Sequence, residues 1–190
     1  MSVTLHTTHG QIKIEVFCES VPKTAEVSSF LISPQEKRPN TPSPQNFLAL
    51  CASSAYDASP IHRLIPGFIL QTGSPAPSPS NPNPKHTTKI STSIWGSTFE
   101  DEIRPTLRHN ARGIVSMANK GKDTNGSQFF ITFGKAEHLD GVNTVFGRVI
   151  GEEGMETLGK LEGVEVDGKG RPKGAVRIEK VTVHANPLAG

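Results

Sequence analysis

Short runs of apolar or alternating residues, each bounded by glycine, proline, asparagine or aspartate, constrain the fold of this chain more than any other feature. Alternate side chains of a strand point to opposite faces of a sheet, so runs of this kind predict short strands. They cover residues 3–7, 11–17, 61–65, 68–72, 113–117, 128–133, 145–150 and 176–184. Because many short strands would leave unpaired edges, we expect a closed or nearly closed antiparallel barrel.

Two segments have helical composition. Residues 155–161 predict a short helix, and residues 46–52 predict another. Pro22 suits the first turn of a helix that would continue into residues 46–52. The prolines between Pro34 and Pro44, however, cannot occupy a helix interior. The sequence therefore predicts that this helix is interrupted.

Length, charge and cysteine content narrow the class of protein. A chain of 190 residues suits one compact domain, and a net charge of +2 reflects a slight basic excess without a concentrated basic stripe. The first residues lack the pattern of a leader peptide, and no run reaches the length of a membrane span. We therefore expect a nuclear or cytoplasmic protein that binds neither membranes nor nucleic acid directly. Cys18 and Cys51 are too few for a disulfide framework and are expected to be reduced.

Other polar residues favour structural roles. The seven histidines, among them His62, His109 and His138, show no His-x-x-x-His spacing, so surface or hydrogen-bonding roles are expected. The acidic run 100–102 is expected to be a solvated patch, with a cluster that orients a partner as the alternative. The glycines mark turns and form no Gly-x-Gly-x-x-Gly phosphate loop. The sequence thus predicts neither a metal nor a cofactor.

Three segments, 61–71, 116–119 and 125–132, carry the candidate chemistry. From Phe68 onward, the strand period places Phe68 and Leu70 on one face and Ile69 and Gln71 on the other. Arg63 lies in an apolar run, where an unpaired charge would be costly. Taken alone, this arginine either forms an ion pair on the surface or is held in place for use.

Together with residues 99–102, 138–141 and 145–147, these segments resemble the signature blocks of the cyclophilins, and the resemblance runs along nearly the whole chain. Residues 1–7, 12–19, 46–51 and 184–187 resemble one subgroup of that family, which is associated with spliceosomes. The resemblance implies peptidyl-prolyl cis-trans isomerase activity. It also implies a mainly β fold, a closed antiparallel barrel of eight strands capped by two helices, with a groove on its outer face for a proline-containing peptide.

The resemblance also assigns roles to individual residues. Arg63, Phe68 and Gln71 match the catalytic positions. The remaining groove positions are matched by Ile69, Ala118, Asn119, Gln128, Phe130, His138 and Leu139. His138 and Asn143 stand where several cyclophilins have tryptophan and histidine, so the rim of the groove is expected to differ. The family requires no cofactor or metal.

Two segments depart from the family pattern. We expect a single domain over residues 1–190 with insertions at about 27–45 and 74–93. The first insertion is either a surface loop that splits a helix or a translated, retained intron, since Val27–Ser28 and Gln45 can be encoded by the usual intron boundaries. Sequencing the transcript would decide between these. The second insertion replaces a short glycine-rich loop beside the groove.

The partners that the resemblance implies are proline-containing peptides and proteins, including spliceosomal proteins, bound by a monomer. An alternative function is a non-catalytic module that binds prolyl peptides as a scaffold within a spliceosomal assembly. Direct RNA binding is a weaker alternative, because an aromatic content of 6% leaves few stacking platforms.

Overall fold

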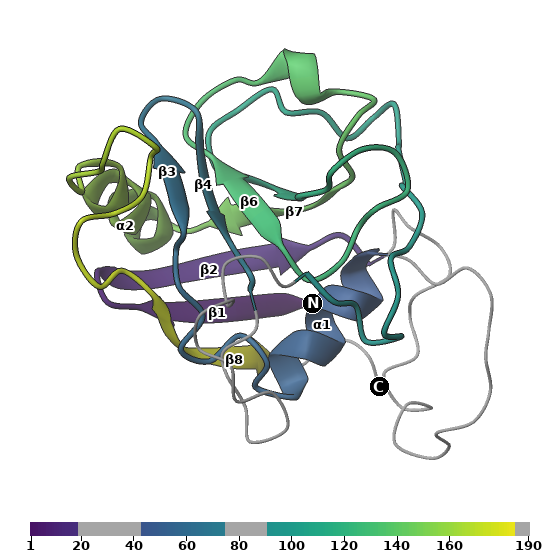
Figure 1. The fold of residues 1–190 in the computed structure, drawn as a ribbon, viewed down its shortest axis with the longest axis horizontal. Helices are drawn as coiled ribbons and strands as arrows, with labels where there is room; N and C mark the ends of the chain where they lie inside the picture. Colours follow the sequence, from purple (N-terminus) through teal and green to yellow (C-terminus); the bar gives the residue numbers. More distant parts are fainter. Residues whose placement is uncertain (19–42, 75–90, 185–190) are drawn as a thin grey trace.

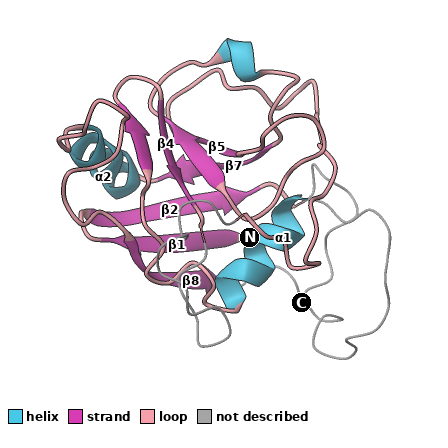
Figure 2. Cartoon of the chain, viewed as in Figure 1, coloured by secondary structure: helices cyan, strands magenta, loops and turns pink. Residues whose placement is uncertain are grey.

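The computed structural model describes residues 1–18, 43–74 and 91–184. This part of the chain is mainly β, with eight strands and two α-helices (Figures 1 and 2). The strands are β1 (Ser2–Thr7), β2 (Gly10–Val16), β3 (Arg63–Ile65), β4 (Ile69–Thr72), β5 (Ile114–Met117), β6 (Phe129–Thr132), β7 (Val145–Ile150) and β8 (Ile178–His184). The helices are α1 (Ser43–Ala52) and α2 (Glu152–Glu162), and a short 3₁₀ helix, η2, spans Glu137–Leu139.

The eight strands form one antiparallel sheet in the order β3-β4-β6-β5-β7-β2-β1-β8. The sheet curls, but the predicted closed barrel is wrong, because β3 and β8 remain its two edges. Within the described residues, the edges are joined by an isolated bridge between Pro60 and Arg177, just before each edge strand begins. The strand β3 then departs from β8, since the N–H of Leu64 donates to the carbonyl of Gly170 at 2.7 Å. Because β3 has only three residues and bonds to the loop that precedes β8, the strands β3 and β8 do not pair with each other.

The core lies inside the curl and is closed by the two helices. From α1, Phe47 packs on Phe129 and Phe146, with ring centroids 5.2 and 5.0 Å away. From α2, Leu158 and Leu161 are fully buried in the same core. Adjacent residues of a strand face opposite sides, so Phe130 lies on the outer face of the sheet, outside this core cluster, although it is buried. The core inside the curl therefore does not account for the burial of Phe130.

The predicted helices are confirmed within the described residues, with different starts. The segment 46–52 lies in α1, which begins at Ser43, and 155–161 lies in α2, which begins at Glu152. The helix start at Pro22 lies outside the described residues, as do most of the insertions at 27–45 and 74–93. Cys18 and Cys51, the two cysteines of the chain, are both reduced, as expected.

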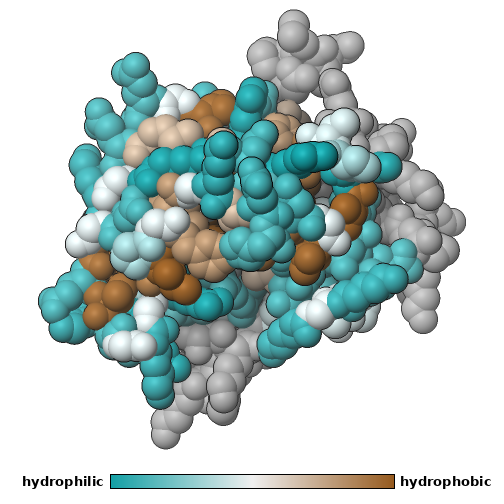
Figure 3. Space-filling view, turned by 90° about the horizontal axis from the view of Figure 1, so that it is seen from above, coloured by the Kyte–Doolittle hydropathy of each residue, from teal (hydrophilic) through white to brown (hydrophobic). Residues whose placement is uncertain are grey.

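Apolar side chains also reach the surface, in small groups set among polar ones (Figure 3). The large hydrophobic residues exposed in the described part are Trp95, Ile103, Val142 and Met155. Among the described residues, no helix is both long and apolar enough to span a membrane. The same residues hold no group of three metal-ligating side chains placed to bind an ion.

Candidate active site

The hairpin β3–β4 places the first candidate residues. Its register pairs Arg63 with Gln71 and Ile65 with Ile69. The turn between the strands contains Gly67 at φ +74°, a conformation that glycine adopts without strain. The side chain of Arg63 is exposed, which leaves its guanidinium free to meet a ligand on the outer face of the sheet.

The register of the next strands extends this pair into a row. Gln71 of β4 lies opposite Phe130 of β6, which lies opposite Ser116 of β5. Residues directly opposite one another in antiparallel strands project from the same face. Arg63, Gln71 and Phe130 therefore share the outer face, and Ile69 shares it two residues along β4, as the sequence predicted.

The floor of this face is apolar and closely packed. Phe130 is 4% exposed and Ile69 is 5% exposed. The ring of His109 stacks on Phe130 with centroids 5.8 Å apart, and Asp140 holds His109 through contacts of 2.8 Å to its backbone N–H and its Nδ1. Phe130 therefore has a fixed orientation, which a pocket for one ring requires.

Phe68 does not follow the strand period predicted from the sequence. It precedes β4, in the turn, and is half-buried outside the core that contains Leu70. Its ring packs against the ring of His138 in η2, with centroids 5.3 Å apart. Leu139 follows His138 and is half-buried, so Phe68, His138 and Leu139 bring the turn and η2 to the site.

A chain of amide hydrogen bonds orients the polar side of the row. Gln71 Nε2 donates to Gln128 Oε1 at 3.0 Å, and Gln128 Nε2 donates to Ser74 Oγ at 2.9 Å. The backbone N–H of Gln128 donates to Ser91 Oγ at 3.3 Å. Gln71 is therefore fixed directly to Gln128, and Gln128 is held in turn by Ser74 and Ser91, on either side of the segment 75–90.

The segment 118–119 borders the same strands. The N–H of Ala118 donates to the carbonyl of Gln128 at 3.0 Å. The side chain of Asn119 is turned to its own protein, since Nδ2 donates to Asp101 at 3.1 Å and Oδ1 accepts from Asn143 Nδ2 at 3.4 Å. A ligand would thus meet Asn119 through its backbone.

Burial decides the charge of the two histidines nearest the row. Desolvation lowers the pKa of His62, against hydrogen bonds to Pro60 and Gln128 that raise it, and the charge of Arg63 lowers it further. Desolvation also lowers the pKa of His109, although hydrogen bonding to Asp140 opposes the shift. Both imidazoles are therefore neutral near pH 7, and they add no positive charge beside Arg63.

Three residues that support the site were not found from the sequence. The sequence predicts only a surface or hydrogen-bonding role for His109, places Ser74 in an insertion, and places Asp101 in a solvated acidic patch. That last prediction is wrong for Asp101, which is half-buried and accepts side-chain and backbone hydrogen bonds. Asp101 lies in the signature block 99–102, but the motif match gave it no role, and His109 and Ser74 lie outside the signature blocks. Each of the three acts through a segment distant in the sequence.

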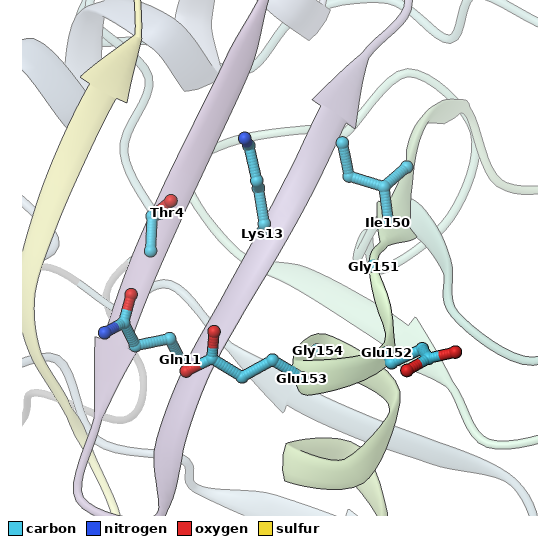
Figure 4. A pocket seen from close by; sticks show the side chains of 8 residues that line it. All are labelled: Thr4, Gln11, Lys13, Ile150, Gly151, Glu152, Glu153 and Gly154. Atoms are coloured by element: carbon cyan, nitrogen blue, oxygen red, sulfur yellow. The ribbon is translucent and has the colours of Figure 1, made fainter.

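A hollow elsewhere on the molecule contains none of the predicted site residues. It is lined by Thr4 of β1, Gln11 and Lys13 of β2, and residues 150–154, which run from the end of β7 into the first turn of α2 (Figure 4). Another hollow lies beside it and is lined by Gly151, Glu152, Met155 and Glu156. The candidate site is instead an open row of residues on the surface of the sheet.

Sequence comparison assigns the class. Residues 35–183 match the family model described as cyclophilin type peptidyl-prolyl cis-trans isomerase/CLD. The chain belongs to the cyclophilin-type peptidyl-prolyl cis-trans isomerases, as its signature blocks indicated. Enzymes of this family act on the peptide bond that precedes proline.

Individual relatives narrow the position within the family. A protein of Gibberella zeae named peptidyl-prolyl cis-trans isomerase-like 3 is 64% identical, with both chains covered completely. The human protein of the same name is 50% identical over all of this chain and 99% of its own. These relatives confirm the subgroup that the opening and closing blocks predicted.

A solved structure supports the fold. A cyclophilin type isomerase of Cryptosporidium parvum, crystallised in the presence of the dipeptide Ala-Pro, superimposes with a TM-score of 0.76 at 36% identity. The match covers 98% of this chain and 100% of that one. The curled eight-stranded sheet with two helices is therefore the fold of this family.

Proposed function

We propose that Arg63 catalyses rotation about Xaa-Pro bonds of peptides bound across β3, β4, β6 and β5. The observation that carries the proposal is the row formed by Arg63, Gln71 and Phe130. It sets an exposed cation and an amide beside a buried aromatic floor on one face of the sheet. A proline ring on Phe130 would bring its peptide bond within reach of both polar groups.

The reaction needs only that the loss of amide resonance be compensated. That loss produces a barrier of about 18–20 kcal/mol, and no bond is made or broken. As the bond twists, the proline nitrogen becomes pyramidal and regains a lone pair. A guanidinium N–H of Arg63 can then donate to this nitrogen, whereas the planar ground state offers almost no acceptor there. Arg63 therefore stabilises the transition state selectively.

Arg63 cannot be the whole catalyst. A hydrogen bond to a charged group contributes about 1.5–3 kcal/mol, which corresponds to roughly a ten- to hundredfold acceleration. The remaining catalysis comes from binding. Phe68, Ile69, Phe130 and Leu139 hold the prolyl ring, while Gln71 and the backbone of Asn119 hold the residue before it, so that rotation occurs about one bond.

The apolar floor contributes in a second way. A twisted amide is less dipolar than a planar one, so transfer to an apolar surface favours the twisted form. Phe130 and Ile69 provide that surface, and the neutral ring of His109 behind Phe130 keeps it free of added charge. This mechanism requires no metal, nucleotide or covalent intermediate.

The cellular role that we propose is the isomerisation of spliceosomal proteins by a monomer in the nucleus or cytoplasm, with residues 1–190 forming one domain. Support comes from the subgroup resemblance and from the relatives named isomerase-like 3. Affinity purification from nuclear extract should recover splicing proteins with the wild-type chain. Recovery of the same proteins by an unrelated cyclophilin would contradict a specific role.

The decisive experiment measures the cis-to-trans rate of a short Ala-Pro peptide at a temperature where uncatalysed exchange takes minutes. Wild-type protein should accelerate exchange, and Arg63→Ala should lose most of that acceleration. Arg148→Ala is the matched control, since Arg148 is an exposed strand arginine paired with Glu15. Peptide binding without acceleration by folded wild-type protein would refute the proposal and favour the scaffold function.

A further inference from the structure

The carboxylate of Asp101 collects hydrogen bonds from three different residues. Its Oδ1 accepts from Asn125 Nδ2 at 2.8 Å and from Asn119 Nδ2 at 3.1 Å, and its Oδ2 accepts from the N–H of Asp123 at 2.8 Å. The N–H of Asp101 donates in return to Asp123 Oδ1 at 2.9 Å. A carboxylate has enough lone pairs to accept all three donors, whereas no neutral side chain of this size does.

The three donors span one loop. Residues 118–125 connect the groove segment after β5 with the turn that leads into Gln128 and β6. The isolated bridge between Phe99 and Asn125, with hydrogen bonds of 3.0 and 3.2 Å, brings the segment that contains Asp101 alongside the end of this loop. Asp101 therefore holds both ends of the loop at once.

The conformation of this loop determines what Asn119 offers to a peptide. The side-chain amide of Asn119 is engaged with Asp101, Asn125 and Asn143. Its contribution to binding must therefore come from its backbone, whose position depends on the loop. Asp123, at φ 58°, adopts a left-handed conformation that costs energy for a residue other than glycine. The hydrogen bonds exchanged with Asp101 offset that cost.

We propose that Asp101 is a positioning residue for substrate binding, which holds the backbone of Asn119 where it can grip the residue before proline. This inference rests on the proposed function of the groove. Asp101 touches no reacting atom and acts only through the loop. A groove of this kind binds ground state and transition state through the same backbone contacts, so Asp101 governs peptide affinity more than the rate of the bound peptide.

The test compares Asp101→Asn with Glu100→Gln. Asp101→Asn places an NH₂ group opposite the N–H of Asp123. Two donors then face each other, so one hydrogen bond of the set is lost. Glu100→Gln makes the same change of charge at an adjacent, exposed carboxylate. NMR titration with a proline peptide gives the dissociation constant, and exchange spectroscopy gives the isomerisation rate of the bound peptide.

For Asp101→Asn we expect a dissociation constant raised about tenfold, the effect of one charge-assisted hydrogen bond, and a bound-state rate within about twofold of wild type. Glu100→Gln should match wild type in both. An unchanged dissociation constant in folded Asp101→Asn would overturn the inference, as would a loss confined to the bound-state rate. If Asp101→Asn does not fold, Asp101→Glu keeps the charge but displaces the carboxylate, and wild-type affinity in that variant would overturn the inference equally.

The role of Asp101 and the catalytic role of Arg63 can be refuted independently. If Arg63→Ala abolishes acceleration while Asp101→Asn binds as wild type does, the proposed function stands and the role of Asp101 is refuted. If wild-type protein binds peptide without acceleration, the catalytic role of Arg63 fails, but the affinities of Asp101→Asn and Glu100→Gln still test Asp101.

Discussion

The imidazole ring of His109 lies stacked on the phenyl ring of Phe130, with centroids 5.8 Å apart and planes 18° apart. Its Nδ1 contacts Asp140, and its Nε2 is buried with no hydrogen-bond partner among the described residues. Protonation of Nε2 would therefore bury a charge and leave a donor unpaired. The aromatic floor at Phe130 thus rests on an imidazole that must remain neutral.

The first prediction is a loss of stability in mild acid. Burial lowers the pKa of His109, so below the ordinary histidine value of about 6.5 the unfolded chain binds more protons than the folded one. The free energy of unfolding should therefore fall as the pH is lowered from 6.5 toward the folded pKa. Urea denaturation at a series of pH values measures this slope.

His109→Phe is the matched variant, because phenylalanine can keep the stack on Phe130 and cannot titrate. Its stability should depend less on pH between 6.5 and 5 than that of wild-type protein. The slope that remains is assigned to His62, whose pKa is also lowered by burial. Equal slopes in the two proteins would show that His109 does not determine the acid sensitivity.

Ser74 provides a second prediction, for the amide chain. Ser74 is fully buried, and its Oγ accepts a hydrogen bond from Gln128. Ser74→Ala leaves the Gln128 amide with one partner fewer and should cost about 1–3 kcal/mol of stability. Because Gln128 orients Gln71, the KM for a proline peptide should also rise severalfold. Thermal denaturation and a protease-free isomerase assay measure the two effects.

Ser53→Ala is the control for this change. Ser53 is exposed, and its Oγ donates to the carbonyl of Leu50 at the end of α1. An exposed substitution of this kind should change stability by less than about 0.5 kcal/mol and leave the KM unchanged. If Ser74→Ala and Ser53→Ala have the same KM, Ser74 does not contribute to peptide binding.

Local periodicity predicted much of the fold and one part of the site. The alternating runs identified every strand found in the described residues, and the period of two placed Ile69 and Gln71 together on the face opposite Leu70. It failed at Phe68, because the strand begins one residue later and Phe68 belongs to a turn. The two-residue period predicts the face on which a side chain lies only where the chain is extended.

The supporting contacts of the site could not be predicted in this way. Asp101 meets Asn119, Ser74 meets Gln128, and these partners are far apart in the sequence. Such contacts follow from the register of strands and the path of loops. Barrel closure was mispredicted for the same reason, since the length of β3 and the hydrogen bond of Leu64 to Gly170 decide it.

The third prediction concerns the turn that carries Phe68. The carboxylate of Glu162 at the end of α2 accepts from the N–H of Gly67 at 2.7 Å and from Arg112 at 2.6 Å. Glu162→Gln would set an amide NH₂ against one of these donors, which should cost about 1 kcal/mol and raise the KM as the turn loosens. Glu165→Gln, at an exposed ion pair with Lys173, should cost less than about 0.5 kcal/mol.

The pH dependence gives this prediction a second readout. Burial raises the pKa of Glu162, but the hydrogen bonds from Arg112 and Gly67 outweigh it and leave the pKa below its ordinary value. The stabilisation from Glu162 is therefore present above about pH 4.3 and is lost as the pH falls through the folded pKa. Glu162→Gln should lack this component. If Glu162→Gln is as stable as wild type at pH 7, Glu162 does not stabilise the turn at Gly67.

The last prediction contrasts two glycines. A Cβ at Gly126 would lie 2.4 Å from Ser91 Oγ and 2.6 Å from the carbonyl oxygen of Ser91. The hydroxyl could rotate away, but the carbonyl belongs to the backbone, and Asn46 already holds Gly126 by a 2.7 Å hydrogen bond to its carbonyl. Gly126→Ala should therefore destabilise the protein by about 1–3 kcal/mol.

At Gly159 in α2, no heavy atom lies within 4 Å of an added Cβ. Gly159→Ala should stabilise the protein by up to about 1 kcal/mol, because alanine is the better helix former. The two variants carry the same chemical change, so differential scanning calorimetry should show shifts of opposite sign. Gly126→Ala should also weaken peptide binding, since the turn at Gly126 leads into Gln128, whereas Gly159→Ala should bind as wild type does. Shifts of the same sign would mean that the segment at Ser91 yields to the new methyl group and does not fix the turn.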